Sequence, residues 1–84
     1  MKLFLISQTE NNDYDTFDSA VVAAPDEDTA RLLDPGSFDG KPYTEWDKHY
    51  STWCRSPEQV SVRYLGEADP DIGLGVICAS FNAG

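Results

Sequence analysis

The apolar residues of this chain come in short runs, each about as long as a single β-strand. Four segments combine apolar and β-branched residues in this way: residues 2–7, 19–24, 60–65 and 75–81. The first and last are apolar on both faces, whereas the third alternates with a period of two. These patterns predict four strands, with residues 2–7 at the centre of a sheet. We expect two antiparallel hairpins, one from the first two strands and one from the last two.

Helical signals lie between the second and third strands. Residues 26–33 begin with three acids, which complement the positive end of a helix dipole, and a proline at position 35 disfavours further helix. Four side chains then fall at i, i+3, i+4 and i+7, which predicts a second short helix over residues 43–53: Trp46, His49, Tyr50 and Trp53. Residues 56–59, Ser-Pro-Glu-Gln, predict one capped turn that leads into the third strand.

Together these elements predict an α+β fold. The 84 residues form a single domain (1–84) with one small core. The expected architecture is ββ-α-(α)-ββ, a four-stranded and mainly antiparallel sheet with one or two short helices on one face. A large enzyme fold with a deep cleft is excluded by the length.

The charge is strongly acidic and unevenly distributed. There are 15 acidic and six basic residues, for a formal net charge of −9. Nine of the acids and two of the bases lie in residues 1–39, whereas residues 40–66 are nearly neutral and rich in aromatic residues. This balance argues against direct nucleic-acid binding and against an anionic membrane surface, since both need clustered Lys and Arg.

The start of the chain and its two cysteines bear on the compartment. The apolar start of the chain is too short for an export signal or a membrane span, so we expect a cytoplasmic protein. Two cytoplasmic thiols are usually reduced and unpaired. Cys78 lies in the run Val76-Ile77-Cys78-Ala79 and is predicted to be a small buried apolar residue.

Catalytic patterns are missing from the sequence. The single histidine, His49, lies five positions before Cys54, but no third group near them would orient a nucleophile and base. One histidine and two cysteines are also too few for a typical zinc site. We therefore predict that the protein is not an enzyme, and that it has neither a catalytic residue nor a cofactor.

One acidic loop has the spacing of a possible calcium site. Its carboxylates are Asp13, Asp15 and Asp18. The loop lacks the glycine at position six and the glutamate at position twelve that an EF-hand requires. The alternative is a solvated acidic loop between two strands, and on this reading no metal site is predicted.

Two sets of residues are candidates for binding a partner. Acidic side chains could meet Lys and Arg of a basic protein surface; these are Asp13, Asp15, Asp18, Asp26, Glu27 and Asp28. Aromatic side chains could anchor the same partner, because Trp and Tyr dominate interface hot spots; these are Trp46, Tyr50 and Trp53. The alternative for the aromatic set, with Tyr43, is that one helix face packs in the core.

Both ends of the chain resemble a group of small phage and prophage-encoded proteins. The resemblance is carried by Lys2-Leu3-Phe4-Leu5-Ile6, the segment YDTFDSAVVAA at 14–24, Ala30-Arg31, LGEAD at 65–69 and GVICASFNAG at 75–84. It implies a viral protein that acts in the bacterial cytoplasm of a host. Small acidic phage proteins of this kind often bind and disable a host complex, including CRISPR defence systems. The resemblance implies no catalytic residue.

The resulting prediction is a non-enzymatic phage protein that inhibits a host defence or nucleic-acid-processing complex through an acidic surface. Two alternatives stay open. The protein could sequester a small ligand such as a nucleotide signal, with aromatic stacking and with Lys48 or Arg55 on the phosphate. It could also be an accessory protein of the virion. The partner and the oligomeric state do not follow from the sequence.

Overall fold

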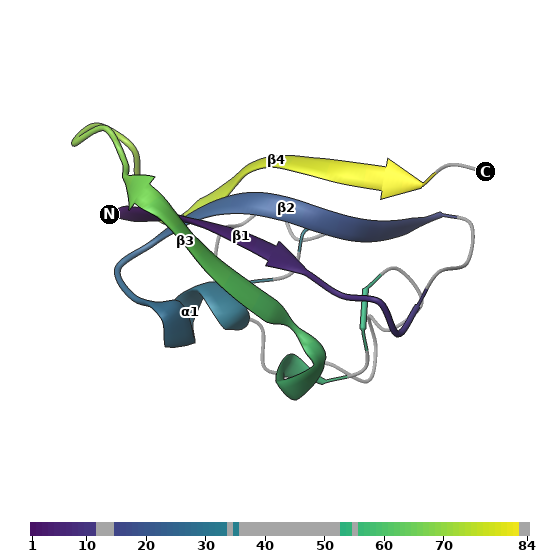
Figure 1. Cartoon of the computed structure of the whole chain (residues 1–84). Helices are drawn as coiled ribbons and strands as arrows, with labels where there is room; N and C mark the ends of the chain where they lie inside the picture. The colour runs from purple at the N-terminus through teal and green to yellow at the C-terminus, as the bar shows by residue number, and fades with distance from the viewer. Residues whose placement is uncertain (12–14, 34, 36–52, 55, 83–84) are drawn as a thin grey trace.

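Four strands form one antiparallel sheet in the order β3-β1-β2-β4 (Figure 1). In the computed structural model, their bounds are β1 Lys2–Ser7, β2 Thr16–Ala24, β3 Ser61–Glu67 and β4 Gly75–Asn82. The structure describes residues 1–11, 15–33, 35, 53–54 and 56–82. The α+β architecture of a small single domain is confirmed, and so is the central place of β1.

The predicted strands agree closely with the observed ones. β1 has the predicted bounds, β3 and β4 differ from prediction by one or two residues at their ends, and β2 begins three residues earlier than expected. The earlier start of β2 comes from pairing with β4, where Phe17 lies opposite Phe81 and Asp18 is the extra residue of a bulge. The polar residues at 16–18 hide this extension from a pattern based on apolar runs.

The predicted hairpin of β3 and β4 is wrong. β3 pairs with β1 and β4 pairs with β2, so the two strands lie on opposite edges of the sheet. Crossing from one edge to the other requires about 14 Å, three strand spacings. The connection at residues 68–74 can span about 25 Å when extended, and is therefore long enough to cross the end of the sheet.

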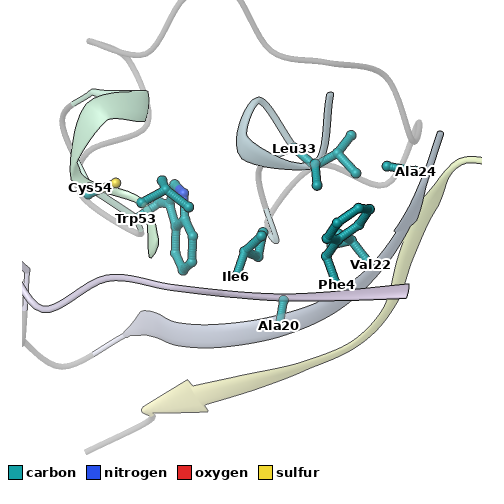
Figure 2. Packing of buried hydrophobic residues seen from close by; sticks show 10 residues of the cluster. Phe4, Ile6, Ala20, Val22, Ala24, Leu33, Trp53 and Cys54 are labelled. Carbon is teal, nitrogen blue, oxygen red and sulfur yellow. The ribbon is translucent and has the colours of Figure 1, made fainter. Parts of the chain in front are cut away.

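One face of the sheet carries the core (Figure 2). Phe4 and Ile6 of β1 lie on this covered face beside Ala20 and Val22 of β2, and all four are buried. The elements packed against them contribute five further buried side chains: Ala30, Leu33, Trp53, Cys54 and Val60. The expected arrangement, with helical structure on one face, is confirmed.

The helix α1 (Glu27–Arg31) is shorter than the predicted 26–33. Asp26 is its N-cap and accepts a hydrogen bond from the backbone N–H of Thr29 at 2.7 Å. The capped turn at 56–59 is confirmed as the 3-10 helix η2 (Pro57–Gln59), with the Ser56 N–H donating to the Gln59 side chain. The second predicted helix, 43–53, lies outside the described residues apart from Trp53.

Polar side chains link the end of β1 to the segment that carries Trp53. The buried Gln8 donates from Nε2 to the carbonyl oxygens of Asn11 and Phe17, at 2.8 and 2.9 Å. Asn11 in turn donates from Nδ2 to the Trp53 carbonyl at 3.1 Å. These bonds satisfy backbone groups beside the core and hold the Trp53 segment against the sheet.

The opposite, open face is more exposed. Leu5 and Val21 lie opposite each other on it and are half-buried, and Cys78 of β4 lies opposite Val21. Cys78 is exposed, so its predicted burial is wrong: it lies on the open face of β4, which is an edge strand of the sheet. Cys54 is buried, and both thiols are free as expected.

Candidate functional site

The pairing of the strands gathers carboxylates at one end of the sheet. Lys2 at the start of β1 lies opposite both Ala24 at the end of β2 and Glu67 at the end of β3. α1 and the turn between β3 and β4 follow at this same end (Figure 1). We call it the acidic end, and its exposed carboxylates are Asp26, Glu27, Asp28, Glu67, Asp69 and Asp71.

The acidic end contains a shallow, open depression with a volume of about 480 Å³. Its lining residues are Lys2, Phe4, Asp26, Glu27, Tyr64 and Glu67. Tyr64 packs edge-on against Phe4, with 5.8 Å between the ring centroids, and is still 55% exposed. The depression therefore combines an accessible aromatic ring with carboxylates that come from two elements far apart in the sequence.

Hydrogen bonds set the charge state of the site. Bonds from Thr29, first its side chain and then its backbone N–H, hold the pKa of Asp26 below its ordinary value, and the charge of Lys2 lowers it further. Partial burial raises the pKa of Tyr64, and the nearby Glu67 raises it again, since the Tyr64 hydroxyl donates to Glu67 Oε2 at 3.2 Å. At neutral pH Asp26 is ionised and Tyr64 is a neutral hydrogen-bond donor.

The positive charge near this site does not balance the negative charge. Among the described residues that line the depression, Lys2 is the one side-chain cation. Arg31 bonds to Glu27 at 3.2 Å and also donates to the Val60 carbonyl, which ties α1 to the start of β3. The field at this end is therefore negative, and the carboxylates there are open to a cationic partner.

The acidic residues predicted to form one surface separate into two groups. Asp26, Glu27 and Asp28 lie together at the acidic end, whereas Asp15 and Asp18 lie toward the other end of β2, about 20–30 Å away along the strand. Asp13 lies outside the described residues. A single surface that includes Asp15, Asp18 and the α1 carboxylates is therefore wrong.

Three carboxylates of the acidic end were not among the predicted site residues: Glu67, Asp69 and Asp71. Each lies about 40 positions from α1 in the sequence, and only the pairing of β3 with β1 brings them to that end. Tyr64 was missed as well. A prediction that paired β3 with β1 would have placed Glu67 beside Lys2 and found the site.

Of the three predicted aromatic anchors, the structure describes Trp53. Trp53 is fully buried, so its proposed role as a surface anchor is wrong, and its ring instead fills the core over Ile6 (Figure 2). The alternative, in which the aromatic face packs in the core, holds for Trp53. Tyr43, Trp46 and Tyr50 lie outside the described residues.

The part of the chain that the structure describes gives little support to a metal site or to a second charged binding site. There, no group of three or more His, Cys, Asp or Glu side chains could hold a metal ion. The Asp13-Asp15-Asp18 pattern and His49 involve residues outside that part. A second hollow, of about 200 Å³, lies on the open face beside Leu5, Val21 and Cys78, and none of its described lining residues is charged.

Comparisons with known proteins leave the chain without an assigned family. No protein-family model, no curated protein and no solved structure matches it. Within the described residues, the structure has no helix with the length and apolar character needed to cross a membrane. The resemblance to small phage proteins stays a prediction. The acidic end is the candidate binding site among the described residues.

Proposed function

We propose that this protein is a non-enzymatic, phage-encoded inhibitor that binds a host protein complex in the bacterial cytoplasm. The target we propose is a defence or nucleic-acid-processing complex, as for an anti-CRISPR protein, and the contact is made by the acidic end. One observation supports this most: six exposed carboxylates from α1, β3 and the β3–β4 turn lie at the same end as the exposed ring of Tyr64.

The depression suits a Lys or Arg side chain. A guanidinium or ammonium group can stack on the face of an exposed tyrosine and gain attraction from the ring. The same group can donate charge-assisted hydrogen bonds to carboxylates, and Asp26 and Glu67 both line the depression beside Tyr64. A basic protein surface would supply several such groups at once, and the shallow shape leaves them room to enter.

Inhibition follows from the kind of surface that such a partner carries. Complexes that hold nucleic acid do so through clustered Lys and Arg. An acidic protein that covers such a cluster removes it from the phosphates and associates quickly through electrostatic steering. The net charge of −9 favours this competition and disfavours direct contact with nucleic acid.

A matched pair of charge-reversal variants tests the proposal. One double variant, Asp28→Lys/Glu67→Lys, reverses two negative charges at the acidic end. The control, Asp18→Lys/Glu58→Lys, makes the same change in net charge elsewhere. All four residues are exposed. Each variant is used as bait for affinity capture from host lysate, and the captured complex is then titrated with purified protein at low and high salt.

The acidic-end variant should bind its captured target at least about tenfold more weakly, and the control should bind like the wild type. Wild-type binding should also weaken as salt rises. Equal binding by both variants, with no salt dependence, would contradict the proposal. Specific binding of a nucleotide in calorimetry, or tight association with phage particles, would instead favour one of the alternative functions.

A further inference from the structure

We draw no further inference here: the strongest candidate, the hollow of about 200 Å³ on the open face of the sheet beside Leu5, Val21 and the exposed thiol of Cys78, rests on an unpartnered apolar face and a lone cysteine, and nothing in the described part of the structure shows what covers it.

Discussion

The two faces of the sheet carry similar apolar residues but bury them to different degrees. On β1, Phe4 and Ile6 point to the covered face and are buried, whereas Leu3 and Leu5 point to the open face and are half-buried. Neighbouring positions of one strand thus differ in how far they are buried. An apolar residue on a strand contributes to stability in proportion to the cover it receives, and α1 and the Trp53 segment provide that cover on the face of Phe4 and Ile6.

The largest expected effect is at Trp53, which covers the core face. Trp53→Ala should cost about 3–5 kcal/mol, because it removes a large buried ring and leaves a cavity. This is a large part of the 5–15 kcal/mol that is typical of a whole domain. Urea unfolding followed by circular dichroism measures the loss. A change below about 1 kcal/mol would show that Trp53 does not hold the covered face together.

A pair of neighbouring truncations compares the two faces directly. Ile6→Ala should cost about 2–5 kcal/mol, since Ile6 is fully buried. Leu5→Ala should cost about 1 kcal/mol, since half-burial gives roughly half of the transfer free energy of a leucine. The same unfolding measurement checks both variants. Equal costs would mean that the open face is covered in solution.

A third prediction concerns the cap of α1, the helix that covers the core face. Asp26→Ala removes the acceptor for the Thr29 N–H and should lower the free energy of unfolding by less than the core variants do. Asp26→Asn keeps a cap acceptor and should be milder.

The pH dependence of the same site can be predicted with its sign. The pKa of Asp26 is lower in the folded chain than its ordinary value of 3.8. The ionised carboxylate therefore contributes stability above that value, and this contribution is lost as the pH falls through the lower folded pKa. Unfolding curves from pH 7 down to pH 2 should show a steeper loss in the wild type than in Asp26→Asn. Parallel curves would contradict the role of the Thr29 hydrogen bonds.

The smallest expected effect is at the exposed thiol of the open face. Cys78→Ser should change the free energy of unfolding by no more than about 0.5 kcal/mol, as for most surface substitutions. In the native wild type, a thiol reagent should modify Cys78 quickly and the buried Cys54 only after unfolding. Fast labelling of both thiols would show that the cover near Trp53 opens readily.

The amino-acid sequence by itself determined where the four strands, α1 and η2 lie along the chain, though not all of their bounds. The apolar runs specify the four strands, because alternation and β-branched residues favour extended backbone. Asp26 and Gln59 specify the start of α1 and the turn of η2, because their side chains accept from backbone N–H groups three residues away. The antiparallel pairing of β1 and β2 also followed from their order in the chain.

Only the tertiary structure decided which strand pairs at each edge of the sheet. Periodicity reports on neighbours in the chain, and a seven-residue connection allows β3 and β4 either to pair with each other or to cross to opposite edges. That choice placed Glu67 and Tyr64 beside α1, exposed Cys78, and left β4 at an open edge. The acidic end and the open edge are consequences of pairing between distant segments, and composition alone does not specify such pairing.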